Sequence, residues 1–177
     1  MTISDDLRER IRERANLACE YCGVTEVDTG GLLTLDHFQP QAHGGDDDAQ
    51  NLFYCCHACN SYKADYWPTQ PTEIGLRNPR FEPREIHMLT LADGMLHPIT
   101  ATGAWTVKRL RLNRPPLVAY RRAKQSQAEE LRLLTRYRDL VSLLENLQQQ
   151  QAALLEEHHA LLEELRALLR LMLSGSE

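Results

Sequence analysis

The sequence has no long apolar segment. Nowhere in the 177 residues is there a stretch of about 18 uncharged apolar residues, the length that could span a bilayer. The start, from Met1 to Asp6, has neither the basic nor the apolar region of a signal peptide. We therefore expect a soluble, cytoplasmic protein that does not bind a membrane.

The chain as a whole also lacks a net positive charge, because acidic residues outnumber basic ones. The formal net charge of -5 argues against a generally basic coat for nucleic acid. Acidic residues, however, are absent between Asp93 and Glu129. The basic residues of this segment are Lys108, Arg109, Arg111, Arg114, Arg121, Arg122 and Lys124. We expect them to contact phosphates, although a solvated helix face is the common alternative for a run of charges.

The second part of the chain lacks helix breakers. All eight prolines and all five cysteines lie within residues 1–116, whereas no proline or glycine occurs between Pro116 and Gly175. Residues 117–174 consist almost entirely of helix formers such as Leu, Glu, Gln, Ala and Arg. This composition predicts a compact domain followed by one long helix.

Leucines recur every seven residues along this expected helix. They are Leu133, Leu140, Leu147, Leu154, Leu161 and Leu168. This seven-residue repeat, with a second set of positions three or four residues from each leucine, is the pattern of a coiled coil. It predicts a homodimer. A further apolar stripe, which includes Leu134 and Leu162, favours a higher oligomer or a protein partner that docks on the same helix. A helix packed on its own domain is the remaining alternative.

Four of the five cysteines form two C-x2-C pairs, Cys19 with Cys22 and Cys56 with Cys59. In a reducing compartment, this spacing indicates zinc ligands rather than disulfides. We expect the four thiolates to bind one structural Zn²⁺ that stabilises a unit too small to be secure alone. Cys55 would give a C-x3-C spacing, so we expect it to be a small buried residue.

The 33 residues between Cys22 and Cys56 predict an insert between the two pairs. Leu32–Leu35 is typical of a strand that ends at Asp36 and His37, and Leu52–Tyr54 of a returning strand. No proline or glycine occurs in residues 56–65, which predicts a helix. We therefore expect a ββα unit.

The insert contains residues suited to phosphodiester hydrolysis. A neutral imidazole such as that of His37 can accept the proton of an attacking water. Asp36 and Asn60 offer the hard oxygen ligands that Mg²⁺ prefers, and the cation can neutralise charge on the phosphate oxygens. Neighbouring residues of a strand point to opposite faces, so Asp36 and His37 can address different sides of one phosphate.

These residues stand in a recognisable pattern. It reads Leu35-Asp36-His37-Phe38-Gln39-Pro40, Gly44-Gly45, Asn51-Leu52, Cys56-x-x-Cys59-Asn60 and Lys63. Over about residues 17 to 66, it resembles the HNH endonuclease family in its cysteine-flanked, zinc-binding form. The resemblance implies that His37 is the general base, that Asp36 and Asn60 bind a single catalytic Mg²⁺ or Mn²⁺, and that Asn51 fixes the hairpin and orients the base. It also implies a phosphate contact by Lys63, and cleavage that leaves 5′-phosphate and 3′-hydroxyl ends.

Residues 67–116 show a hairpin signal at Asp93-Gly94, between residues 86–91 and 95–100. A helix is expected from Thr102, as its cap, to Leu112. We therefore expect an α+β protein in three segments. They are an HNH core with an N-terminal helix (1–66), a linker with a hairpin and a short basic helix (67–116), and an oligomerisation helix (117–174).

The predicted function is that of a metal-dependent HNH endonuclease acting on DNA. One alternative is a nuclease subunit that is active only with a larger partner, for example in a phage-defence or mobile-element complex. A second alternative is a non-catalytic, zinc-stabilised adaptor for nucleic acid. The presence of Asp36, His37, Asn51 and Asn60 argues against the adaptor, since an adaptor does not need this set.

Overall fold

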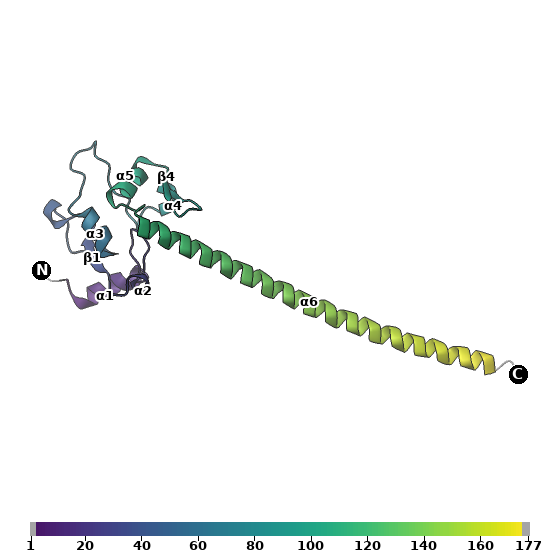
Figure 1. The fold of residues 1–177 in the computed structure, drawn as a ribbon. Helices are drawn as coiled ribbons and strands as arrows, with labels where there is room; N and C mark the ends of the chain where they lie inside the picture. The colour runs from purple at the N-terminus through teal and green to yellow at the C-terminus, as the bar shows by residue number, and fades with distance from the viewer. Residues whose placement is uncertain (1–2, 175–177) are drawn as a thin grey trace. The chain divides into compact units, whose positions relative to one another are not determined.

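The computed structural model describes residues 3–174, with side chains up to Met172. The chain divides into two compact units, Met1–Gln125 and Ser126–Glu177 (Figure 1). The first unit holds every strand that the structure describes, and the second holds only helix.

The centre of the first unit is a ββα element. Strand β1 (Thr34–His37) pairs antiparallel with β2 (Leu52–Cys55), and Asp36 lies opposite Phe53 in the register. Helix α3 (His57–Lys63) follows directly and packs on β1. Cys56 caps this helix, because its Sγ accepts a hydrogen bond from the backbone N–H of Cys59. The two strands and the helix expected from the sequence are confirmed.

Two further helices lie N-terminal to this element. Helix α1 (Asp5–Arg14) is capped by Ser4, and the short helix α2 (Glu26–Thr29) begins with a capping box of Thr25 and Asp28. The guanidinium of Arg12 on α1 donates two hydrogen bonds to the Glu26 carboxylate, at 2.5 and 2.7 Å. This pair joins the two helices.

Residues 67–116 form a second small sheet with helices beside it. Helix α4 (Arg84–His87) leads into β3 (Met88–Thr90), which pairs with β4 (Leu96–Pro98), so the expected hairpin is confirmed. Helix α5 (Ala101–Arg109) begins two residues earlier than expected. Its cap is Thr100, whose Oγ1 accepts from the Gly103 N–H at 3.0 Å, so the expectation of Thr102 as the cap was wrong.

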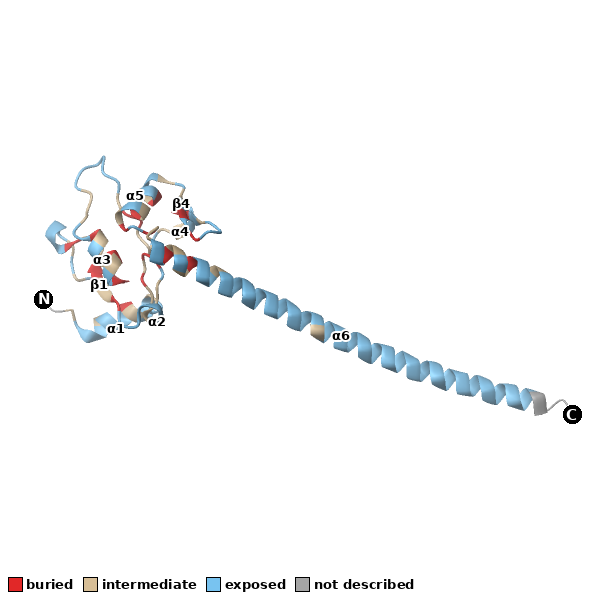
Figure 2. Ribbon diagram, in the orientation of Figure 1, coloured by how far each residue is buried: buried red, intermediate tan, exposed pale blue. Residues whose placement is uncertain are grey.

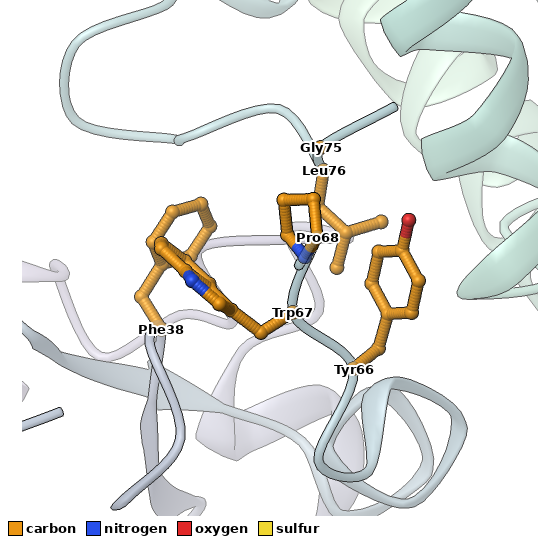
Figure 3. Close-up of a pocket in the computed structure, with 6 residues that line it drawn as sticks. All are labelled: Phe38, Tyr66, Trp67, Pro68, Gly75 and Leu76. Atoms are coloured by element: carbon orange, nitrogen blue, oxygen red, sulfur yellow. The ribbon is translucent and has the colours of Figure 1, made fainter. Parts of the chain in front are cut away.

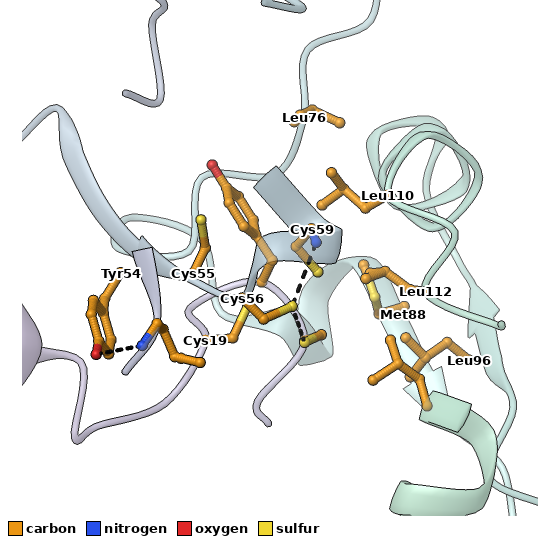
Figure 4. Packing of buried hydrophobic residues seen from close by; sticks show 14 of the residues in the cluster. Cys19, Tyr54, Cys55, Cys56, Cys59, Leu76, Met88, Leu96, Leu110 and Leu112 are labelled. Carbon is orange, nitrogen blue, oxygen red and sulfur yellow. Dashed lines mark hydrogen bonds between the residues drawn. The ribbon is translucent and has the colours of Figure 1, made fainter. Parts of the chain in front are cut away.

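Both parts of the first unit share one core. The buried cysteines belong to the same cluster as Leu76, Met88, Leu96, Leu110 and Leu112, which come from residues 67–116 (Figure 4). These residues are therefore part of the folded unit rather than a loose connection.

Helix α6 (Pro115–Ser174) is the last element. Its first turns belong to the first unit, where Leu117 and Arg121 are buried. From Ser126 to Met172 every side chain except that of Val141 is exposed (Figure 2). None of the helices in the described part of the chain is both long and apolar enough to cross a membrane.

Candidate active site and metal centre

Four cysteines meet at the junction of a turn and a helix. Cys19 and Cys22 lie in the turn after α1, where Gly23 adopts a φ of +81° that favours glycine. Cys56 and Cys59 come from the start of α3. All four are buried, and their Sγ atoms lie within 4.8 Å of one another.

The spacing of these sulfur atoms fits a zinc ion. A tetrahedral site with Zn–S bonds of about 2.3 Å has sulfur–sulfur edges of about 3.8 Å. The Sγ atoms of Cys22 and Cys56 are 3.7 Å apart. Neither Cys55, which is buried elsewhere in the core, nor the exposed His57 belongs to the cluster. Four buried cysteines in this arrangement can hold Zn²⁺.

The four thiols of the cluster shift one another's pKa values. Hydrogen bonds from neighbouring thiols lower the pKa of Cys19 and of Cys56. The same contacts raise the pKa of Cys22 and of Cys59. Four thiolates buried together would repel one another, so a cation bound among them would stabilise the charged cluster.

Arg114 lies against this cluster. Its Nη2 is 3.7 Å from the Sγ of Cys59 and 3.9 Å from that of Cys56. Its guanidinium also lies over the ring of Tyr62. The phosphate contact expected of Arg114 therefore competes with a position beside sulfur ligands, where its charge offsets that of the thiolates.

Asp36 is buried at the end of β1. Its carboxylate accepts hydrogen bonds from the Tyr21 hydroxyl at 3.3 Å and from the Lys63 Nζ at 3.3 Å. Burial raises the pKa of Asp36, and the charge of Lys63 opposes this effect. The contacts are long, and a carboxylate has about four lone-pair positions. Asp36 thus retains capacity for a further ligand.

Lys63 is fully buried, with 0% of its surface exposed. Its Nζ donates to the backbone oxygen of His37 at 2.6 Å as well as to Asp36. The expected phosphate contact by Lys63 is not compatible with this position. The side chain instead connects α3 to the end of β1.

His37 is half-buried and lies beside an acidic loop. Its Nε2 is 2.7 Å from the Oδ1 of Asp47, which also accepts from the Gln41 side chain at 2.9 Å. The hydrogen bond with His37 lowers the pKa of Asp47. Nothing in the sequence separates Asp47 from its acidic neighbours Asp46 and Asp48. The contact depends on how the loop folds back.

Asn51 determines the path of that loop. Its Oδ1 accepts from the Gln39 N–H at 2.8 Å, and its Nδ2 donates to the backbone oxygens of Gln39 and Asp46 at 3.0 and 2.9 Å. At Gly45, a Cβ atom would lie 1.8 Å from the Gln39 oxygen, so only glycine fits. Asn51 and Gly45 together bring Asp47 to His37.

Asn60 is half-buried on α3, the helix that packs on β1. Its backbone N–H bonds to the Cys56 oxygen at 3.0 Å. Within residues 3–172, no hydrogen bond involves its side chain. The amide oxygen is therefore available to a ligand, on an element next to the strand of Asp36.

The cations between Asp93 and Glu129, where acidic residues are absent, include both buried and exposed side chains. Arg121 is buried, and it donates to the backbone oxygens of Gly94 and Leu112 at 2.6 and 2.9 Å, so the expected phosphate contact does not fit its position. Arg109 is half-buried and donates to the Lys63 oxygen at 3.0 Å. The exposed members of the segment are Lys108, Arg111, Arg122 and Lys124.

Comparison with known proteins agrees with this geometry. Residues 19–65 match the model of the HNH endonuclease family, and the match contains all four cysteines of the cluster together with Asp36, His37, Asn51 and Asn60. No curated protein and no solved structure matches the chain. Residues 19–65, whose ββα element carries a buried four-cysteine cluster at its flank, are an HNH endonuclease domain.

Proposed function

We propose that the protein is a metal-dependent endonuclease that hydrolyses phosphodiester bonds in DNA. The observation that carries this proposal is the contact of His37 with Asp47 at the end of the strand that also bears Asp36. An imidazole held by a carboxylate and placed beside a possible metal ligand suits the activation of water.

His37 acts as the general base. Because its Nε2 faces the Asp47 carboxylate, that nitrogen carries the proton in the neutral ring, which leaves Nδ1 as the basic atom. None of the described residues makes a hydrogen bond with Nδ1. Nδ1 can therefore accept the proton of a water molecule that attacks the phosphorus.

Asp36 and Asn60 hold one catalytic Mg²⁺ or Mn²⁺. Both offer hard oxygen atoms, and the Asn60 side chain has no hydrogen-bonding partner among the described residues. When bound, the cation supplies positive charge to the nonbridging and leaving oxygens of the phosphate. Lys63 and Tyr21 keep the Asp36 carboxylate in place.

The four cysteines hold a structural Zn²⁺. The ion joins the turn after α1 to the start of α3, and thus holds together the two ends of the matched segment. Because four thiolates fill its tetrahedral shell, no position is open for water. Its role is to stabilise the fold that positions His37.

Helix α6 associates with a second copy of the chain. The exposed heptad leucines, 52–65% accessible from Leu133 to Leu168, support this association. A dimer would carry two sites, each of which cuts one strand. The same exposed stripe favours one second candidate function, a nuclease subunit that acts with a larger protein bound to α6.

A plasmid-nicking assay tests the main proposal. Wild type with Mg²⁺ or Mn²⁺ should convert supercoiled DNA to nicked circles, whereas His37→Ala should not, with equal zinc content in both proteins. Nicking by purified His37→Ala at the wild-type rate would exclude the base assignment. Activity of wild type only after addition of cell extract would favour the second candidate.

A further inference from the structure

We propose that an aromatic cavity beside the active site binds one unstacked nucleobase of the DNA substrate. Phe38, Tyr66, Trp67, Pro68, Gly75 and Leu76 line this cavity. The inference rests on the proposed nuclease function and adds a substrate class to it. The preferred substrate is single-stranded or locally unpaired DNA.

The cavity has the size and the walls that an aromatic base needs. Its volume is about 190 Å³, and Figure 3 shows Phe38 and Trp67 on one side with Leu76 and Tyr66 on the other. The rings of Phe38 and Trp67 meet edge to face, with centroids 5.8 Å apart. Among the described residues the indole N–H of Trp67 has no hydrogen-bonding partner. A planar base can use both this apolar surface and this donor.

The cavity is continuous with the loop that holds the general base. Phe38 directly follows His37, and its backbone N–H bonds to the Asn51 oxygen at 2.8 Å. A second hollow shares Phe38 and Trp67 with the cavity and extends over the neighbours of Asp47 in the loop. A base in the cavity would thus belong to the same bound strand as the phosphate that His37 addresses.

Two cations lie over aromatic rings at the Tyr66 side of the cavity. The Arg109 guanidinium lies 5.1 Å from the centre of the Tyr66 ring, and Lys108 Nζ lies 5.9 Å from that of Trp105. The Tyr66 and Trp105 rings pack together at 5.4 Å. Aromatic rings combined with cations are typical of single-strand binding, where bases stack and phosphates find positive charge.

Intact duplex DNA cannot fill the cavity, because its bases are stacked inside the helix. A base reaches such a site only from a single strand, or after extrusion from a duplex, which is easiest at an unpaired position. Binding should therefore be tightest for a single strand, intermediate for a duplex with one unpaired nucleotide and weakest for a perfect duplex.

The test uses the full-length His37→Ala protein, loaded with zinc, so that DNA is bound but not cut. Fluorescence anisotropy measures its affinity for a labelled single strand and for a strand of the same length made of abasic units. Trp67→Ala should weaken binding of the normal strand by about fivefold or more, while Trp67→Phe retains most of it. Phe81→Ala, which removes an exposed aromatic ring outside the cavity, is the matched control and should change nothing. The abasic strand should bind weakly and regardless of residue 67.

A second measurement does not depend on the folding of Trp67→Ala. The chain has two tryptophans, so Trp105→Phe in the same background leaves Trp67 as the only indole. A saturating single strand should quench its fluorescence, and the abasic strand should not. No quenching at saturation, or equal affinity for normal and abasic strands, would overturn the proposal.

The failure of this inference and the failure of the nuclease proposal are distinguishable. If Trp67 controls single-strand binding but wild type cuts no DNA, the base site stands and the nuclease assignment fails. If wild type cuts single strands and Trp67→Ala binds and cuts them equally well, the nuclease assignment stands and the base site fails.

Discussion

The imidazole of His37 and the carboxylate of Asp47 lie 2.7 Å apart, although the two residues are ten positions apart in the chain. His37 ends β1, whereas Asp47 belongs to the loop that Asn51 ties to Gln39 and Asp46. The proposed general base is therefore held by a residue of the connection between the two strands. Substitutions in this connection should therefore affect activity as much as substitutions in β1 itself.

Asp47→Ala should lower kcat at least about tenfold, because the imidazole loses the group that fixes its tautomer and orientation. KM for DNA should change little, since Asp47 is not expected to contact a phosphate. Asp46→Ala is the matched control, because among the described residues the Asp46 side chain accepts only from the Asp48 N–H and does not hydrogen-bond with His37. Steady-state kinetics on a labelled oligonucleotide would separate the two constants. Equal kcat for the two variants would contradict an orienting role.

Cys59→Ser should unfold the first unit, because the zinc ion loses one of four buried ligands and its binding free energy contributes directly to folding. Cys55→Ala is the matched control, since Cys55 is equally buried but lies outside the cluster. It should retain one zinc per chain and a cooperative melt. Elemental analysis with circular dichroism checks both variants, and a folded, zinc-free Cys59→Ser protein would exclude the structural role of the metal.

Arg114→Ala should release zinc to a competing chelator faster than wild type does, because the guanidinium offsets the negative charge of the Cys56 and Cys59 thiolates. Arg122→Ala, which removes an exposed cation of the same segment, should retain zinc normally and weaken only DNA binding. Release rates can be followed with a colorimetric zinc indicator. The reverse pattern in the two variants would restore Arg114 as a phosphate-binding residue.

Light scattering at micromolar concentration should give twice the 20.3 kDa mass of one chain, as expected for a homodimer through α6. Leu147→Asp should shift the protein toward the monomer, because it places a charge in the leucine stripe. Gln149→Asp lies two residues further along the exposed helix and outside the stripe, so it should leave the mass unchanged. A monomeric wild type would refute self-association and favour a different protein as the partner of the leucine stripe.

The sequence predicted the elements of the site better than the directions of its side chains. The C-x2-C spacing alone predicts the cysteine cluster, because each pair can place two thiolates on one ion. The strand pattern next to Asp36 and Asn51 likewise predicts the hairpin. The sequence predicts phosphate contacts for Lys63 through the family resemblance and for Arg121 through the run of cations without acidic residues. Only the fold shows that carbonyl groups and a carboxylate surround them inside the unit. Asp47 was missed for the same reason, since its partner depends on the path of a loop.

The buried ammonium group of Lys63 affects how a divalent ion would bind at Asp36. It holds the Asp36 carboxylate and the end of β1 in one arrangement within the protein alone. In the proposed function, a divalent ion would then meet a preorganised ligand, so its entry would require little loss of side-chain entropy. Occupancy should depend mainly on the free energy of stripping water from the ion, which is higher for magnesium than for softer or larger cations.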